Sequence, residues 1–231
     1  GVQTCALPIC LCSMPGIVRA QLSVHQFDQL MKKIDDVLWY EKVGDIAHVD
    51  KVILCGPPRW KEFNPTSMSA GNELKFRAYI FIPKSVDENK KYPLIVFPHS
   101  GVHADMDTYY AHIIRELIAQ EYIVVAADYR GSTGYGSGTY NNIDYGGLEN
   151  EDVYISRNYM VDNFDIVDGS RVGIMGWSHG GMITLMNLYL LYKDSQSNES
   201  DQTGKAQSPP SSRLSKHSTS FHPRFQFFLR Q

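Results

Sequence analysis

Residues 171–181 read RVGIMGWSHGG, and this stretch decides the fold. A short, almost continuous apolar run leads into a serine flanked by glycines, and residues 182–188 (MITLMNL) continue with apolar side chains. Runs of this kind are typical of strands that are buried on both faces of a parallel sheet. The stretch therefore predicts a buried strand over residues 171–176, a sharp turn at Ser178 and a helix that begins at Gly180.

Working outward, strand-like and helix-length segments alternate along the chain. The strand-like runs lie at residues 49–55, 75–83, 93–98 (PLIVFP) and 122–127 (YIVVAA). The helix-length segments lie at residues 27–39, 106–120 and 148–164. In the second of these helices, the apolar stripe consists of Tyr109, Ile113, Leu117 and Ile118. The alternation predicts an α/β protein with a mostly parallel, doubly wound sheet and right-handed crossovers.

The serine lies in a GxSxG pattern, residues 176–180, with one further glycine at 181. A nucleophilic serine requires a strained turn, and glycines on both sides permit the close approach of strand and helix that a Cβ would block. The turn exposes the hydroxyl and directs the N–H groups of the helix N-terminus toward it. An ordinary glycine-rich corner is the alternative, but the buried strand before and the apolar helix after favour a nucleophile at Ser178.

Composition excludes several classes of function. The 231 residues are 43% hydrophobic, which suffices for the core of one domain, and the net charge of -3 gives no global attraction to nucleic acid or anionic membrane. No apolar run is long enough to span a bilayer. The cysteines at positions 5, 10, 12 and 55 fit neither a disulfide framework nor a CxxC metal site.

The two ends differ from the middle. In residues 1–20, an apolar stretch precedes Val18 and Ala20, the small residues that signal peptidase requires. This pattern predicts export to the periplasm or the medium. The alternative is that the segment is an artefact, and then a cytoplasmic protein stays possible. Residues 194–231 form a tail, which between 194 and 220 is rich in Ser, Gln, Asn, Lys and Pro, and we expect it to be disordered or non-native.

Three blocks in the middle carry a resemblance to a known family. They are KYPLIVFPHSG at 91–101, DYRGSTGYG at 128–136 and RVGIMGWSHGG at 171–181. In this order and on these strands, they resemble the catalytic domain of the prolyl oligopeptidase family of serine peptidases. The resemblance implies an α/β-hydrolase fold, a peptide or ester substrate and no cofactor. It also implies a β-propeller in many members, for which residues 21–75 leave no room.

The resemblance implies a role for each matching residue. Ser178 would attack the carbonyl carbon, and the backbone N–H of His179 would be one donor to the oxyanion. The second donor would be the N–H of Gly101, in the loop after the third strand. The family usually has His-Gly-Gly in that loop, whereas this chain has Ser100 before Gly101. The Cβ of Ser100 could crowd the loop, which puts the second donor in question.

The rest of a catalytic triad is not found. In this fold the acid and then the base follow the serine in the chain, each after a later strand. The later candidates all lie in the polar tail, where no strand would position them. They are Asp194, Asp201, His217 and His222. We therefore expect residues 21–193 to form an incomplete α/β-hydrolase domain, with its first five strands but without the later ones.

Two other kinds of site are disfavoured. The glycines of residues 131–138 follow a strand but match neither GxGxxG nor GxxxxGK, so they do not predict a nucleotide site. His99, His103 and Asp105 lie in a loop rather than at helical spacing, so no metal site is expected. Asp128 and Arg130 are expected to hold a loop together rather than to react.

Three functions stay open at this point. The ring of His179 should point away from the attacking oxygen, so this histidine is expected to pack or to lie at the rim of the substrate site rather than to act as the general base. The first function is a serine peptidase that acts through an acyl-enzyme on Ser178, with this chain inactive by itself. The others are a carboxylesterase of the same fold and a non-catalytic fragment or binding module. The oligomeric state is open.

Overall fold

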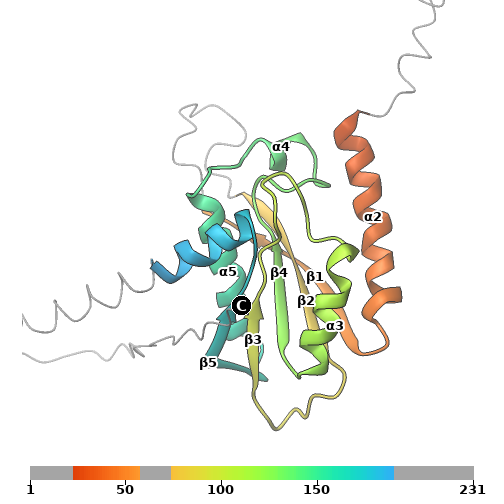
Figure 1. Ribbon diagram of the computed structural model, residues 1–231, viewed down its shortest axis with the longest axis vertical. Coiled ribbons are helices and arrows are strands. Elements are labelled where there is room, and N and C mark those ends of the chain that lie inside the picture. Colours follow the sequence, from red (N-terminus) through yellow and green to blue (C-terminus); the bar gives the residue numbers. More distant parts are fainter. Residues whose placement is uncertain (1–22, 58–73, 190–231) are drawn as a thin grey trace, which may run out of the picture.

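The computed structural model describes residues 23–57 and 74–189 (Figure 1). Within these ranges, five strands form one sheet in the order β1-β2-β4-β3-β5. The strands are β1 (Ala47–Cys55), β2 (Lys75–Pro83), β3 (Tyr92–Val96), β4 (Ile123–Asp128) and β5 (Val167–Ile174). The predicted signal-peptide remnant at 1–20 and the predicted tail at 194–231 lie outside the described residues.

The sheet is mixed, and its parallel part places three strand ends together. β1 pairs antiparallel with β2, and β2 pairs antiparallel with β4. β3 is parallel to both β4 and β5. The carboxyl ends of β3, β4 and β5 therefore meet at one edge of the sheet, where ligands usually bind in open α/β sheets.

Helices cover both faces of the sheet, as predicted for a doubly wound fold (Figure 1). On one face, buried side chains of α2 (Val24–Val43) and α3 (Ala111–Ala119) pack on the strands. On the other face, α5 (Leu148–Asn163) and the helix at 179–189 do so. β4 is buried along its whole length, with Val124 and Val125 in opposite clusters. This two-sided burial explains the continuous apolar run in its sequence.

The predicted helix at 106–120 is the element that differs most. The structure has a short 3-10 turn, η2 (Thr108–Tyr110), followed by α3. The Asp107 carboxylate caps this turn by accepting from the Tyr109 N–H. A 3-10 turn has fewer residues per turn than an α-helix, so its side chains point in other directions than those of a continuous α-helix would. Tyr109 of the predicted stripe is 72% exposed, so its placement on the buried face is wrong. Ile118 is buried and Ile113 and Leu117 are partly buried, as predicted, and Ala111 and Ile114 complete the buried face.

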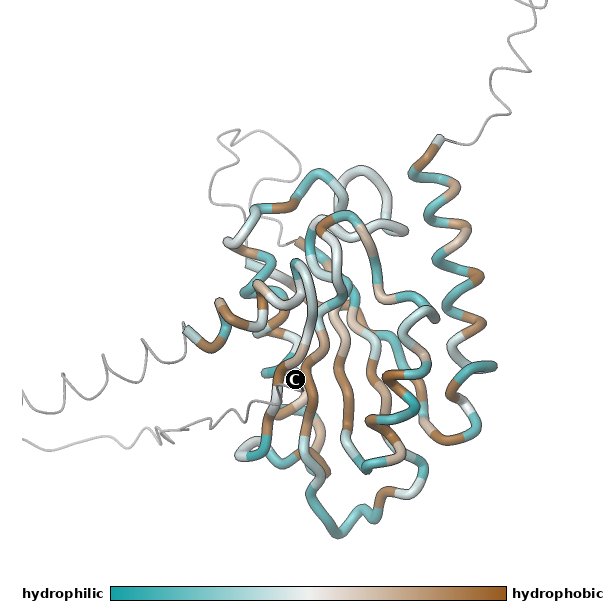
Figure 2. Tube along the Cα trace, in the orientation of Figure 1, coloured by the Kyte–Doolittle hydropathy of each residue, from teal (hydrophilic) through white to brown (hydrophobic). Residues whose placement is uncertain are grey.

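α2 is longer than the predicted helix at 27–39, and its polarity is unusual. A capping box of Ser23 and Gln26 satisfies the first backbone N–H groups and fixes the start of the helix. The side facing the sheet carries Lys32 and Asp36 beside the buried Trp39. Many apolar residues of α2 are exposed, and Figure 2 shows hydrophobic positions along the whole helix. The exposed ones are Val24, Phe27, Leu30, Met31, Ile34, Val37 and Tyr40.

A buried ion pair joins the loop after β4 to α5. The Arg130 guanidinium donates to both carboxylate oxygens of Asp152, at 2.8 and 2.7 Å, and the Arg130 backbone N–H donates to the same side chain. Both side chains are fully buried. Burial raises the pKa of Asp152, although Arg130 opposes this. The predicted structural role of Arg130 in holding the loop agrees with this geometry.

We expect Asp152→Ala to lower the free energy of unfolding by about 3–5 kcal/mol, because it leaves a buried guanidinium without its counter-ion. Urea denaturation followed by circular dichroism would measure the change. The matched control is Asp45→Ala, which removes the exposed partner of Arg115 and should leave the unfolding midpoint unchanged within error. Equal losses of unfolding free energy in Asp152→Ala and Asp45→Ala would show that burial does not decide how much each ion pair stabilises the protein.

Candidate active site

Ser178 lies at a strained turn between β5 and the helix at 179–189. Its backbone φ is 55°, and in the described ranges Glu121 is the only other non-glycine residue with a positive φ. This left-handed conformation is unfavourable for a residue with a Cβ and persists only where the surrounding structure imposes it. Ser178 is also exposed. The predicted strand-to-helix turn with an unusual backbone is therefore confirmed, whereas the catalytic role of Ser178 stays a prediction.

The glycines beside Ser178 allow the turn to lie very close to the segment that follows β3. A Cβ on Gly180 would lie 2.5 Å from the Pro98 carbonyl oxygen and 2.7 Å from that of His99. A Cβ on Gly176 would lie 2.7 Å from the Gly180 backbone. All of these neighbours are backbone atoms, so the rotation of a side chain could not relieve such a clash. The glycines of the motif thus bring the Ser178 turn beside the loop that carries Gly101.

That loop is held by two tyrosines which sequence reasoning did not single out. The Tyr129 hydroxyl donates to the carbonyl of Gly101 at 2.7 Å and lies 3.1 Å from that of His99. The Ser100 N–H donates to the Tyr110 hydroxyl, which also lies 2.9 Å from the Ser100 Oγ. The Ser100 side chain is therefore accommodated rather than crowded. Whether the N–H groups of Gly101 and His179 serve as oxyanion donors stays a prediction.

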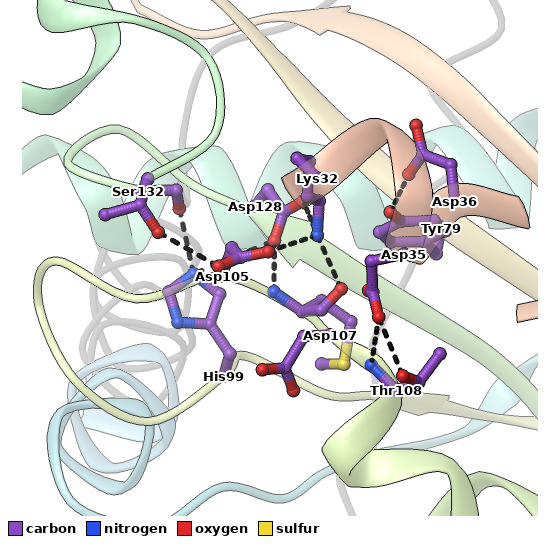
Figure 3. Close-up of polar contacts among 12 residues, drawn as sticks. Lys32, Asp35, Asp36, Tyr79, His99, Asp105, Asp107, Thr108, Asp128 and Ser132 are labelled. Carbon is purple, nitrogen blue, oxygen red and sulfur yellow. Dashed lines mark hydrogen bonds and ion pairs between the residues drawn. The ribbon is translucent and has the colours of Figure 1, made fainter. Parts of the chain in front are cut away.

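A buried ammonium, that of Lys32, joins α2 to the loop after β3 and to the end of β4 at this edge of the sheet (Figure 3). Lys32 Nζ lies 2.6 Å from Asp105 and 3.2 Å from Asp128, and it donates to the Met106 carbonyl at 2.6 Å. Asp128 also accepts from the Met106 N–H and from the Tyr135 hydroxyl. The interpretation of Asp128 as a residue that holds a loop is supported by these contacts.

The charges of this cluster stabilise one another. Burial by itself would lower the pKa of Lys32. The negative charges of Asp128 and Asp105 raise it by more, so the pKa of Lys32 lies above its usual value. Burial works to raise the pKa of Asp128, but Lys32 and His99 hold it below its usual value. Both groups are therefore charged near neutral pH, and their attraction acts in a low-dielectric interior where it is strong.

His99 and His103 are engaged in packing. The His99 ring is fully buried, stacks on Tyr129 with a centroid distance of 4.2 Å, and lies 2.8 Å from the Ser132 hydroxyl. The His103 ring stacks on Tyr140 at 3.7 Å. Burial lowers the pKa of His99. In the described ranges, no group of three or more His, Cys, Asp or Glu side chains is arranged to hold a metal ion.

The His179 side chain is largely buried, with 9% of it exposed. Its Nε2 lies 3.4 Å from Glu149, and Tyr129 and Tyr145 flank the ring. Glu149 is fully buried and accepts from the backbone N–H groups of Gly146 and Gly147. The interpretation of the His179 ring as a packing group therefore agrees with the structure.

Comparison with known proteins relates one segment of the chain to a family. Residues 108–192 match the sequence profile of the prolyl oligopeptidase family, a segment that runs from η2 past the Ser178 turn. This segment is similar to the catalytic part of that family's peptidases. Because the remaining residues lie outside that match, the assignment concerns this segment and the fold around it.

Relatives agree with this assignment. Dipeptidyl-peptidase 5 of Aspergillus oryzae is 32% identical over 117 residues, which cover 49% of this chain and 16% of that protein. The acylamino-acid-releasing enzyme of Sus scrofa is 28% identical over 115 residues, which cover 48% and 15%. The structure of a Mycobacterium tuberculosis puromycin-hydrolyzing peptidase superposes with a TM-score of 0.51 at 25% identity, covering 61% of this chain and 20% of that one.

Two facts follow from these comparisons. The sheet and its helices are part of the α/β-hydrolase fold of prolyl oligopeptidase family peptidases. The chain spans 16% of the length of Dipeptidyl-peptidase 5, so what the whole protein acts on is a matter for proposal.

In the described ranges, no helix is long and apolar enough to cross a membrane.

The family resemblance pointed to Ser178 and its neighbours but not to the residues that hold them. Lys32 lies 73 or more residues before its partners Asp105 and Asp128, and no motif connects them. Glu149 carries no motif either, since a buried glutamate is recognised only when its partners are seen. The sequence of α2 offered no signal for Lys32, because many other positions of this helix are polar or charged as well.

We expect Gly180→Ala to destabilise the protein by about 1–3 kcal/mol, the usual cost of forcing extra atoms into packed structure. Alanine is the better helix former, so any loss reports the clash with Pro98 and His99. Gly138→Ala is the matched control, because a Cβ there meets no atom within 4 Å. Thermal or urea unfolding measures both. If the two variants unfold alike, the close approach at Gly180 is wrong.

We expect stability to fall as the pH drops below about 6.5, the usual histidine pKa. Burial lowers the pKa of His179, with Glu149 opposing, so the unfolded chain binds the proton more readily than the folded one. The loss should level off once the pH is below the folded pKa. Urea unfolding between pH 5 and 8 should show a smaller loss for His179→Gln than for the unchanged chain. The raised pKa values of Asp107 and Asp152 make the folded protein relatively more stable as the pH falls, which opposes the effect of His179. Both proteins share these two groups, so the difference between their curves reports His179. Parallel curves would contradict the burial of His179.

Proposed function

We propose that Ser178 is the nucleophile of a serine peptidase of the prolyl oligopeptidase type. The observation that supports this best is the left-handed, exposed serine at the carboxyl edge of the parallel strands, within a segment that matches the family. A strained backbone costs free energy, and the exposed Ser178 adds little to the core, which favours a functional reason for the strain.

In the proposed reaction, Ser178 Oγ attacks the carbonyl carbon of the scissile bond as its proton passes to a base. The resulting oxyanion accepts hydrogen bonds from the backbone N–H groups of His179 and Gly101. These hydrogen bonds become strongest when the negative charge on the oxygen has formed. Collapse of this intermediate breaks the C–N bond as the protonated base gives its proton to the leaving nitrogen, which releases the amine and leaves an ester on Ser178. Water then attacks the ester while the base takes one of its protons, and the return of this proton to Ser178 Oγ frees the acid and restores the serine.

The surroundings of the turn suit an apolar group of the substrate. Trp177 precedes the nucleophile and is 37% exposed. Its ring lies 5.6 Å from that of Phe97 and 5.1 Å from that of Tyr110, measured between centroids. These aromatic neighbours hold the indole in place beside the nucleophile. We propose that the exposed part of Trp177 contacts the acyl side of the substrate.

The base needs a separate argument. Within the described ranges, no histidine hydrogen-bonds to the Ser178 hydroxyl. His99 is buried beside Ser132, and His179 faces Glu149. The tail candidates Asp194, Asp201, His217 and His222 lie outside the described residues. A serine hydroxyl without a base is a weak nucleophile. We therefore propose that this 231-residue chain, by itself, does not turn over substrate.

A fluorophosphonate probe tests the nucleophile without requiring turnover. An intact oxyanion hole retains a rate advantage of roughly 10³–10⁴ over water even when triad members are removed. We expect slow labelling that peptide mass spectrometry locates at Ser178, in clear preference to the exposed Ser85 and Ser170. The variant Ser178→Ala should lose it. Uniform labelling of serines would contradict the proposal.

Turnover of an activated ester is the complementary measurement. We expect the rate of this chain to equal that of Ser178→Ala, and a longer product of the same gene to hydrolyse the ester if it supplies the base. A rate well above the Ser178→Ala control in the short chain would show that a base is present, with His217 and His222 to be replaced first. An inactive longer product would contradict the peptidase itself.

A further inference from the structure

A groove of about 440 Å³ lies between α2 and the antiparallel strands β1 and β2, beside the loop that follows β4. α2 contributes Lys33 and Asp36, β1 contributes Lys51 and β2 contributes Arg77. The Tyr135 side chain forms part of the lining. The groove is separate from the Ser178 turn, and no role assigned so far uses its charged residues.

The positive charges of this groove outnumber the available carboxylates. Lys51 is paired with Asp36, at 2.7 Å. Arg77 has no carboxylate partner in the described ranges, and its guanidinium lies over the Tyr135 ring at 4.9 Å. Lys51 lies over the same ring, also at 4.9 Å. An aromatic face attracts cations but does not neutralise them, so the Arg77 charge is left available.

The electrostatics of Lys51 agree with an excess of positive charge. Its pKa lies below the usual value, first because of burial and also because of the positive charge on Lys32. Asp36 and Asp128 oppose this shift without cancelling it. Lys33 stands exposed at the rim and adds a further cation. An anion that entered the groove would therefore relieve repulsion as well as gain hydrogen bonds.

We propose that this groove binds a carboxylate group of a peptide, with Arg77 and Lys51 as the donors and Lys33 at the rim. The planar guanidinium presents two parallel N–H groups that match the two oxygens of a carboxylate. Contact with the Tyr135 ring limits the freedom of this guanidinium and so lowers the entropy lost on binding. As a substrate subsite, this groove rests on the peptidase function proposed above.

The position of the groove sets its distance from the nucleophile. Arg77 pairs in register with Asp128, the last residue of β4, so it lies at the same edge of the sheet as the turn after β5. β4 and β3 separate β2 from β5. Three strand spacings amount to roughly 14 Å. An extended peptide covers this span with about four residues, so the carboxylate recognised here belongs about four residues from the scissile bond.

Binding of labelled peptides to the full chain tests the site. The probes are a fluorescent alanine pentapeptide with a free C-terminal carboxylate, its C-terminal amide, and the same amide with a glutamate in place of the last alanine. The first and third probes distinguish a terminal carboxylate from an acidic side chain. We expect fluorescence anisotropy to show at least tenfold tighter binding of a carboxylate probe than of the neutral amide. Equal affinities, or no binding at millimolar protein, would overturn the proposal.

Matched variants locate the binding. Arg77→Met should remove the preference for the carboxylate probe, and Lys33→Met should reduce it. Lys33 is exposed, so its variant stays informative even if Arg77→Met does not fold. Lys75→Met is the control, because Lys75 is an exposed cation on the same strand outside the groove lining. Unchanged binding in both Arg77→Met and Lys33→Met, or a loss as large in Lys75→Met, would overturn the assignment.

Two further measurements distinguish the groove from a phosphate site and from the Ser178 turn. Inorganic phosphate should compete more weakly than the unlabelled carboxylate peptide, and the opposite order would identify a phosphate site and overturn the peptide proposal. Ser178→Ala should bind the carboxylate probe as the unchanged chain does. If the fluorophosphonate fails to label Ser178 while the carboxylate preference persists, the peptidase function fails and the carboxylate site stands. If labelling succeeds and the preference is absent, only the groove is wrong.

Discussion

The buried ammonium of Lys32 is the interaction on which the site depends. It reaches from α2 to the loop after β3, through Asp105 and the Met106 carbonyl, and to the end of β4, through Asp128. An unpaired charge in such a place would cost several kcal/mol, so the three groups must stay together or open the edge of the sheet together. The loop that carries Gly101 is thereby fixed from one side by this cluster and from the other by the hydroxyl of Tyr129.

The strain at Ser178 is possible because of that rigidity. A left-handed backbone at a non-glycine residue persists only where neighbours leave no alternative. Here Gly180 sits so close to the Pro98 and His99 carbonyls that the first turn of the helix cannot shift toward them. The turn and the loop after β3 therefore constrain one another. Their shared boundary is also where the two proposed oxyanion donors would have to meet.

α2 connects this site with the proposed carboxylate groove. Two of its polar residues face the sheet, where Lys32 supports the loop after β3 and Asp36 pairs with Lys51. The same face therefore serves two sites at one edge of the sheet. Trp39 and Val43 are the buried apolar residues of the helix, whereas other apolar residues of α2 are exposed. The interface between α2 and the sheet is therefore partly polar, which explains why a charged residue such as Lys32 lies within it.

The sequence by itself determined the strands, the order of the elements and the serine turn, because these features follow from local patterns. Two-sided burial makes β4 a continuous apolar run, and close backbone contacts require the glycines around Ser178. The start of the helix at 106–120 was predicted less well, because the Asp107 carboxylate caps a 3-10 turn there and Tyr109 within this turn is exposed. Only the tertiary structure decided how the site is held, since Lys32 and Asp128 are far apart in the chain. Burial makes each of these charges depend on partners that the local sequence does not contain.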